Sequence, residues 1–328
     1  MKYTAKAWLA TLALSLVIPA GAWAQSILKI GWTTTDSPDD PYALAAHYFS
    51  DALKESAGDS ITVQYYPNRQ LGDEKQMLEG LRFGTVDAAV ITNSVVAQLE
   101  PAFGLNDLPF LYASANNAYQ VLDGAVGEQL AKKLEAKGVI VLGFTEGGFR
   151  HMLNNKRPVA APEDVKGVKY RVMQNPVFID MFNAMHGSAV PMAWGETFTA
   201  VQQGTIDGLE VPLAVAAGNK LYEVTKFLSL TGHSYSTNLL LISKRAFNKL
   251  TPEQQQQVIA AGKKATDAQR VKSAQNDAAL RKVMADNGMA VNEITDVSAF
   301  RSAVAPLYDK YRPKVGSALL DQALNSAQ

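Results

Sequence analysis

Cysteine is absent from the 328 residues, and histidine occurs only four times. No disulfide can therefore stabilise the fold, and the lipid-bearing cysteine of a membrane-tethered protein is missing. A chain of this length can fold without disulfides, because 47% of its residues are hydrophobic and can fill more than one core. The histidines are scattered without the spacing of metal ligands, so the sequence predicts neither a metal site nor a cofactor.

An excess of charge of one sign is also lacking. The 31 lysines and arginines balance 31 acidic residues, with no block of like charge, so a groove for nucleic acid is not expected. The GxSxG, GxxxxGK[ST] and HExxH motifs are missing, and with them the usual machinery of serine hydrolases, nucleotide enzymes and metalloproteases. These absences favour a binding protein over an enzyme.

Long apolar runs are missing except near the N-terminus. There "AWLATLALSLVIPAGAWA" follows Lys2 and Lys6 and ends in an A-x-A pattern, which is typical of a cleavable secretory signal over residues 1–24. A retained membrane anchor is the alternative, but the apolar core between Lys6 and Pro19 is shorter than the ~20 residues that span a bilayer. The sequence therefore predicts a periplasmic protein whose mature chain starts at Gln25.

Strand-like and helix-like stretches alternate along the rest of the chain. "SILKIGW", "ITVQYY" and "VDAAVIT" have strand character, and "YALAAHYFSDALKESA" and "DEKQMLEGLRFG" have the periodicity of amphipathic helices. "VIVLGFT" ends this series, and a second one runs from "FRHMLNN" through "VKYRVM" and "GETFTAVQQG" to "IDGLEV". Such alternation predicts an α/β fold with a mostly parallel sheet in each of two domains.

One short phrase occurs in both series, as "GTVD" at residues 84–87 and "GTID" at residues 204–207. In both places it lies between an amphipathic run and an apolar one. Glycine there can adopt the left-handed conformation that ends a helix. The phrase is predicted to mark equivalent positions in two similar domains, although an ordinary turn sequence is the alternative.

Two apolar strands, "KFLSLTG" and "TNLLLIS", follow with little more than "HSYS" between them, and are predicted to link the domains as crossover strands. A helix should begin at Thr251 and Pro252 and continue for about 36 residues, or roughly 54 Å at 1.5 Å per residue. It is long enough to lie across both lobes. The predicted first lobe holds residues 25–147 with about 238–275, and the second holds 148–237 with about 276–328. Two such lobes form a cleft that can shut around a small molecule by hinge motion.

At this point the residues carry a family resemblance. The stretches "PEDVKGVKYRV", "VPMAWGETFTAVQQGTIDGLEVPLAV" and "KLYEVTKFLSLTGHSYS" resemble the solute-binding subunit of tripartite ATP-independent periplasmic (TRAP) transporters. "LGDEKQMLEGLRFGTVDAAV" and "LNDLPFLY" fit the same family, so the match runs through essentially the whole mature chain. It implies a two-lobed, type II-like periplasmic binding fold with hinge strands, an organic acid as ligand, and small and large integral-membrane subunits as partners.

Within that family the chain is most similar to binders of hexuronates and related six-carbon sugar acids. A binder of C4-dicarboxylates is the alternative, as is a periplasmic lyase or epimerase acting on the same acids. A sensor role beside transport also stays open.

The resemblance implies that Arg171, in "KYRVM", grips the ligand carboxylate. A guanidinium suits that task because its planar fork of donors meets both carboxylate oxygens. A structural salt bridge is the alternative. Arg150 matches a second arginine of the family, with an interlobe salt bridge as its alternative.

Further residues match family positions around the pocket. Asn238 is expected to contact the ligand, Trp194 to wall the pocket, and Glu210 to be a cleft acid. An ordinary turn asparagine and a core tryptophan are the competing interpretations. Val211 stands where sialic-acid binders tend to have asparagine, which argues against sialic acid. Five other candidates lie on loops expected to face the cleft and could bind hydroxyl groups: Gln174, Asp73, Glu74, Thr92 and Asn93.

Overall fold

The computed structural model describes residues 26–326, whose strands form one nine-stranded mixed sheet. The predicted signal segment lies outside the described residues. The strand order is β2-β1-β3-β8-β4-β7-β5-β6, and β9 pairs with β8. The strands are β1 (Ser26–Gly31), β2 (Ile61–Tyr66), β3 (Ala88–Thr92), β4 (Val139–Asn154), β5 (Lys169–Val172), β6 (Ser188–Pro191), β7 (Gly208–Pro212), β8 (Phe227–Ser243) and β9 (Ala290–Glu293).

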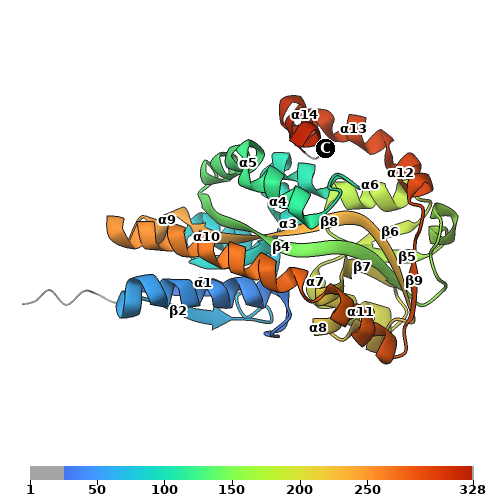
Figure 1. Cartoon of the computed structure of the whole chain (residues 1–328), viewed down its shortest axis with the longest axis horizontal. Coiled ribbons are helices and arrows are strands. Elements are labelled where there is room, and N and C mark those ends of the chain that lie inside the picture. The colour runs from blue at the N-terminus through green and yellow to red at the C-terminus, as the bar shows by residue number, and fades with distance from the viewer. Residues whose placement is uncertain (1–25, 327–328) are drawn as a thin grey trace, which may run out of the picture.

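The strands β4 and β8 lie side by side across the middle of the molecule (Figure 1). The sequence predicts each of them as two shorter strands, which is wrong, because the antiparallel ladder continues through the polar "HSYS" segment with Tyr235 opposite Phe149. Gly148 and Gly232 adopt positive φ angles of 100° and 54° and let the strands bend without ending. The two expected crossover strands, "KFLSLTG" and "TNLLLIS", are the two parts of the single strand β8, which extends past both half-sheets beside β4.

The long strands join two half-sheets. The first half-sheet consists of β1, β2 and β3 and pairs with β8 from Asn238 onward, and the second consists of β5, β6 and β7 and pairs with β4 from Arg150 onward. The predicted lobe boundaries at 147/148 and 237/238 fall near this switch. That division stays a prediction, and the C-terminal helices contact elements of both halves, including α4, α5 and α6.

The repeated phrase occupies equivalent places in the two half-sheets, as predicted. Gly84 and Gly204 both have left-handed backbones, with φ angles of 76° and 71°. Gly84 caps α2, and Gly204 lies one residue beyond the C-cap of α7. The carboxylates of Asp87 and Asp207 each accept a backbone N–H from the adjacent parallel strand, at 3.1 Å from β1 and 2.9 Å from β5. In both copies the glycine turns the chain and the aspartate binds the backbone of a neighbouring parallel strand.

Hydrophobic cores lie on both faces of the continuous sheet. Along β8, Leu239 and Leu241 belong to one core and Leu240 and Ile242 to the other, because successive side chains of a strand point to opposite faces. Helices α4, α5, α13 and α14 lie above the sheet in Figure 1, and α1, α8 and α11 lie below it. The helices of the first core are α2 (Glu74–Phe83), α3 (Asn93–Leu99), α4 (Ala115–Asp123), α5 (Ala125–Glu135), α6 (Pro176–Ala184), α12 (Ser298–Val304), α13 (Pro306–Val315) and α14 (Ser317–Ser326). Those of the second core are α1 (Pro41–Ala57), α7 (Trp194–Gln202), α8 (Leu213–Gly218), α9 (Lys244–Phe247), α10 (Pro252–Ala274) and α11 (Asp277–Asp286).

The long helix predicted from residue 252 to 287 is interrupted. It consists of α10 and α11, which are separated at Gln275 and Asn276. At the break the Asn276 side chain donates to Asp39 in the loop before α1, at 2.8 Å. Helix α10 packs against α1, whereas α11 packs against α8 and β9, so the pair crosses both halves with a change of direction.

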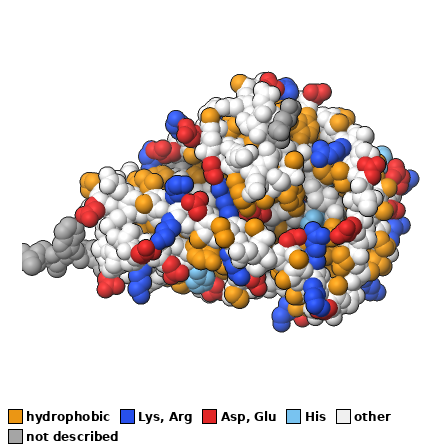
Figure 2. Space-filling view, in the orientation of Figure 1, with side chains coloured by type: hydrophobic (Ala, Val, Ile, Leu, Met, Phe, Trp, Pro, Cys, Tyr) orange, Lys and Arg blue, Asp and Glu red, His pale blue; other side chains and the backbone are white. Residues whose placement is uncertain are grey.

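Charged side chains of both signs are interspersed on the face shown in Figure 2, where no field of a single sign forms. Over the described range 26–326, every helix is too short or too polar to serve as a membrane span.

Candidate functional site

Side chains of both half-sheets converge where β4 and β8 pass from one to the other. They enclose a small cavity, called the inner cleft below. Its lining residues are Thr33, Thr34, Tyr42, Glu74, Gly147, Arg150, Arg171, Met173, Trp194, Val211, Pro212, Val215, Ser236 and Asn238. An adjoining cavity shares Glu74, Arg171, Met173 and Trp194 with it and adds Asp73, Lys75, Val95, Gln174, Met192 and Ala193.

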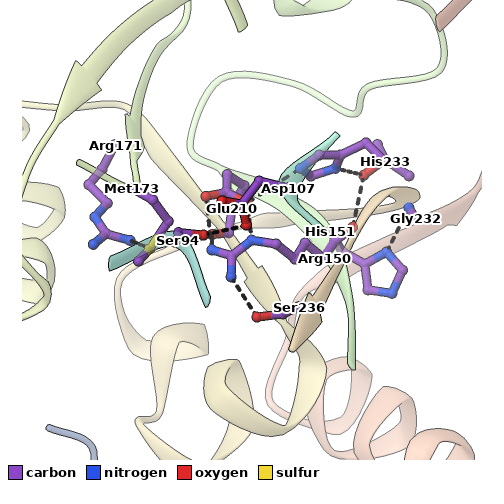
Figure 3. Close-up of polar contacts among 11 residues, drawn as sticks. Ser94, Asp107, Arg150, His151, Arg171, Met173, Glu210, Gly232, His233 and Ser236 are labelled. Carbon is purple, nitrogen blue, oxygen red and sulfur yellow. Dashed lines mark hydrogen bonds and ion pairs between the residues drawn. The ribbon is translucent and has the colours of Figure 1, made fainter. Parts of the chain in front are cut away.

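Arg171 is a buried cation without a counter-ion. It lies on β5 with 2% of its surface exposed, and it makes no ion pair with any residue between 26 and 326. Its Nε donates to the Met192 carbonyl at 2.9 Å. Its Nη1 lies 3.4 Å from the Met173 sulfur (Figure 3). Burial lowers the pKa of Arg171 to about 10, which leaves it charged at neutral pH. The alternative of a structural salt bridge finds no partner among the described residues.

Arg150, on β4, is neutralised by its surroundings. Its Nη2 donates to Glu210 Oε1 at 2.9 Å and to the Glu210 carbonyl at 2.7 Å, its Nε donates to Oε2, and its Nη1 donates to Ser236 Oγ at 3.2 Å (Figure 3). Burial opposes the charge on Arg150, but the Glu210 carboxylate outweighs burial and raises the pKa of Arg150. The guanidinium therefore lines the inner cleft with its charge already compensated.

Glu210 is fully buried on β7 and is not among the residues that line the inner cleft. Its carboxylate accepts from Arg150 and lies 3.3 Å from His233 Nε2. Burial favours the neutral acid, yet Arg150 lowers the pKa of Glu210, so the side chain is ionised. The sequence predicts Glu210 to be an acid that faces the cleft. In the structure its carboxylate instead holds the Arg150 side chain in position.

Asn238 and Trp194 both line the inner cleft. Asn238 lies on β8 with no exposed surface, and neither its amide nitrogen nor its amide oxygen has a hydrogen-bond partner within residues 26–326. Buried amides are nearly always paired in folded proteins, so these two atoms are free to bind a ligand. The Trp194 ring lies 5.9 Å from the guanidinium carbon of Arg171 and separates the inner cleft from solvent-facing pockets.

Glu74 begins α2 and faces the same cavity as Arg171. Its Oε1 accepts the Thr92 backbone N–H at 2.8 Å. Burial raises the pKa of Glu74 to about 7, although Thr92 and Arg171 counteract the shift. Glu74 is consequently only partly ionised at neutral pH, which limits its competition with an anionic ligand for Arg171.

The remaining predicted site residues differ in whether they line a cavity. Asp73 and Gln174 line the adjoining cavity, but Asp73 accepts the Gln76 N–H at 3.0 Å as the N-cap of α2. Thr92 and Asn93 line neither cavity. The Asn93 amide donates within a buried network, at 2.8 Å to the Phe103 carbonyl and 3.0 Å to Asp107.

Sequence reasoning missed several neutral polar groups of the inner cleft, namely Thr33, Thr34, Tyr42 and Ser236. A signal for two of them exists, since "TTT" follows β1 after one intervening residue, Trp32, and ligands of open α/β sheets bind beyond the carboxyl ends of strands. Among the described residues, no group of acidic and histidine side chains could hold a metal ion.

The chain is similar in sequence to proteins of known role. The family model described as "Bacterial extracellular solute-binding protein, family 7" matches residues 33–314. The 2,3-diketo-L-gulonate-binding periplasmic protein of Escherichia coli (strain K12) is 36% identical over 281 residues, covering 86% of this chain and 85% of that protein. A solute-binding protein of Verminephrobacter eiseniae is 35% identical over 309 residues, covering 94% of this chain and 91% of that protein.

Solved structures agree with this relationship. A TRAP periplasmic solute-binding protein of Polaromonas sp. JS666, bound to D-erythronate, is 38% identical with a TM-score of 0.88, over 92% of this chain and 98% of that one. The sugar acid binding protein of Advenella mimigardefordensis, in complex with galactonate, is 31% identical with a TM-score of 0.89, again over 92% and 98%.

The two-lobed periplasmic binding fold, the periplasmic location and the transport role expected from the sequence are thereby confirmed. TRAP binding proteins bind organic acids and work with membrane permease subunits, and they are not enzymes. This chain belongs to family 7 of the bacterial extracellular solute-binding proteins, the solute-binding subunits of TRAP transporters.

Proposed function

We propose that this protein captures a sugar acid in the periplasm by binding its carboxylate to Arg171 and delivers it to the membrane permease. One observation carries the proposal: Arg171 is a fully charged, 2% exposed guanidinium with no carboxylate partner in residues 26–326. An unpaired buried charge is unfavourable, and a ligand carboxylate would relieve that cost with a paired, charge-assisted contact.

The neutral polar groups around Arg171 favour a polyhydroxylated acid. Thr33, Thr34, Tyr42, Ser236 and Asn238 offer hydroxyl and amide groups to the inner cleft. The relatives described above bind galactonate, D-erythronate and diketogulonate, which are all acids with several oxygen substituents.

A C4-dicarboxylate is the second candidate, because a related TRAP binding protein of Sulfurospirillum deleyianum holds succinate. Arg150 argues against it. Glu210 already neutralises that guanidinium, which leaves Arg171 as the cation with unmatched charge in the inner cleft.

The two half-sheets leave little free space between them at the inner cleft. That space is about 30 Å³, roughly two to three times the ~10–15 Å³ that one water molecule needs. A six-carbon acid requires more room, so the half-sheets must move apart about β4 and β8 to admit it.

A thermal-shift screen tests the proposal. The purified protein is heated with galactonate, galacturonate, diketogulonate, erythronate or succinate, and with galactitol as a neutral control of similar size. A true ligand at 100 times its Kd stabilises the native state by about 2.7 kcal/mol. We expect at least one sugar acid, and not galactitol, to raise Tm. Equal shifts by galactitol, or a shift with succinate alone, would contradict the assignment.

The same samples separate binding from catalysis. Proton NMR spectra of each acid incubated with the protein should stay unchanged over time. Sustained conversion to a new product would instead favour the lyase or epimerase alternative.

A further inference from the structure

A second, larger pocket lies on the outer side of Trp194. Its volume is about 310 Å³. It shares Thr33 and Trp194 with the inner cleft, so the two spaces adjoin. This outer pocket is lined by Thr33, Thr35, Asn68, Arg69, Trp194, Gly195, Phe198, Gly218, Asn219, Lys220 and Leu221.

The charges around the outer pocket have one sign. Arg69 and Lys220 line it, and no aspartate or glutamate does. Neither cation forms an ion pair within the part of the chain that the structure describes. The other polar groups are amides and hydroxyls, which donate readily to anions. The chemistry of the lining therefore fits an anionic group beside the apolar faces of Trp194 and Phe198.

The two cations come from opposite sides of the cleft. Arg69 follows β2 in the first half-sheet, and Lys220 follows α8 beyond β7 in the second. The sides meet here, because the Thr35 hydroxyl donates to the Gly218 carbonyl at 3.3 Å. An anion between Arg69 and Lys220 would be attracted to both lobes and would favour the closed state.

The backbone around the outer pocket is held in an uncommon conformation. Five residues other than glycine have positive φ in the described chain, and three of them line this pocket: Asn68 at 53°, Arg69 at 63° and Lys220 at 51°. Such residues gather where a structure positions groups for binding.

Gly195 fixes the place of Arg69. A Cβ atom at Gly195 would lie 1.6 Å from Arg69 Nη1, so the guanidinium rests directly against the first turn of α7, next to Trp194. The charge of Arg69 is thereby held at the boundary between the outer pocket and the inner cleft.

We propose that the outer pocket is a second anion subsite, which receives the distal carboxylate of a sugar acid whose first carboxylate lies on Arg171. The proposal rests on the function assigned above and narrows the ligand class. The protein should prefer aldarates, which carry a carboxylate at each end, to the aldonates of matching stereochemistry.

Calorimetry on matched pairs tests this preference. The pairs are galactarate with galactonate and glucarate with gluconate, and the members of each pair differ only in the terminal carboxylate that the monoacid lacks. Two exposed charge contacts predict that the better-fitting diacid binds roughly 3- to 20-fold more tightly than its monoacid partner. The preference should shrink at high salt, because exposed charges are screened.

Arg69→Gln and Lys220→Gln locate the effect. Each should weaken diacid binding roughly 2- to 5-fold, and more than it weakens monoacid binding. Arg245→Gln is the matched control, since Arg245 is an exposed arginine on α9 that lines neither space, and it should change neither affinity. Equal affinities within both pairs, or a preference that persists in the Arg69→Gln, Lys220→Gln double variant, would overturn the proposal.

Failure of the underlying function gives a different result. Suppose that the wild type binds the mono- and diacids equally well and that Arg171→Ala abolishes binding of both. The outer subsite is then refuted, and the proposed function stands. If wild type binds neither acid, or Arg171→Ala leaves both affinities unchanged, the proposed function falls and the subsite with it.

Discussion

At the scale of single residues, two buried arginines differ in what surrounds them. Arg150 and Arg171 are 4% and 2% exposed, yet Glu210 neutralises the first, whereas no carboxylate of the described chain pairs with the second. The sequence predicts both as ligand contacts. It could not separate their roles, because Glu210 is 60 residues from Arg150 and meets it only through the pairing of β4 with β7.

Replacing Asn238 with leucine should separate binding from folding. The substitution removes two unpaired buried polar atoms and keeps the side-chain shape, so the free energy of unfolding without ligand should stay unchanged or rise by about 1 kcal/mol. Affinity for the acid should fall by about 5- to 150-fold, because lost hydrogen bonds cost about 1–3 kcal/mol. Urea denaturation and calorimetry give the two values.

Asn106→Leu is the control for this experiment. Asn106 is equally buried, but its amide donates to Asn93 at 2.8 Å and accepts from Tyr112 at 2.6 Å. The Asn106→Leu variant should therefore have a lower free energy of unfolding than the wild type. An Asn238→Leu protein that is destabilised as strongly as Asn106→Leu, with normal affinity, would show that Asn238 is structural.

The raised pKa of Glu74 predicts that Glu74 takes up a proton when the acid ligand binds. Its pKa of about 7 should rise further when an anion binds beside it, so affinity should decrease as the pH rises above 7. In the unbound protein the folded state holds more protons at Glu74 than the unfolded state does between pH 4.5 and about 7. The free energy of unfolding should therefore decrease as the pH rises through that range.

Calorimetry at pH 8 in buffers of different ionisation enthalpy measures the uptake. Glu74→Gln should abolish it and flatten the pH dependence of affinity. Undiminished uptake in that variant, or affinity that increases with pH, would contradict the role of Glu74.

How far single binding residues can be predicted depends on their local geometry. Whole motifs surround Arg171 and Trp194, and both residues line the inner cleft. Asp73 and Asn93 are predicted from short polar stretches instead, and in the structure a helix cap and a buried network engage their side chains. Such hydrogen bonds depend on tertiary contacts that no short sequence window contains.

At the scale of elements, the repeated Gly-Thr-x-Asp turn gives a test without side-chain clashes. A Cβ at Gly204 would meet nothing within 4 Å, so Gly204→Ala costs only the left-handed backbone penalty, about 1–2 kcal/mol. Gly204→Asn should cost less, because asparagine tolerates that conformation. Gly84→Ala should cost more than Gly204→Ala, since its Cβ would lie 3.0 Å from Arg245 Cβ.

Urea denaturation midpoints at constant m-value provide the comparison. Equal stability of Gly204→Ala and wild type, or an asparagine variant less stable than the alanine variant, would refute the backbone argument.

Element types were predicted better than element ends. Periodicity identified the amphipathic helices and buried strands, because each places apolar residues on one face. The break between α10 and α11 has no glycine or proline to signal it and arises where Asn276 bonds Asp39, a partner 237 residues away. The length of β4 and β8 also escaped prediction, because strand pairing carries them across polar and glycine-containing segments.

At the scale of the whole molecule, the continuous sheet places a buried cation between its two half-sheets. Each half-sheet contributes to a core on each face, and β4 and β8 are the strands shared by both. Arg171 comes from the second half-sheet and meets Glu74 and Thr33 of the first across the inner cleft. A carboxylate on Arg171 would therefore lie where the lobes touch, and its binding would favour closure.

Calorimetry with Arg171→Ala tests the central claim most directly, with the sugar acid that gives the largest thermal shift as ligand. Removing an unpaired cation should leave the free energy of unfolding without ligand unchanged or higher, so loss of binding cannot be ascribed to misfolding. Affinity should fall by about 2–5 kcal/mol, or roughly 30- to 4,000-fold, and Arg171→Lys should also lose affinity because an ammonium lacks the planar fork. Arg245→Ala should bind as the wild type does. An Arg171→Ala protein that holds the acid within a few-fold of wild-type affinity would contradict the account.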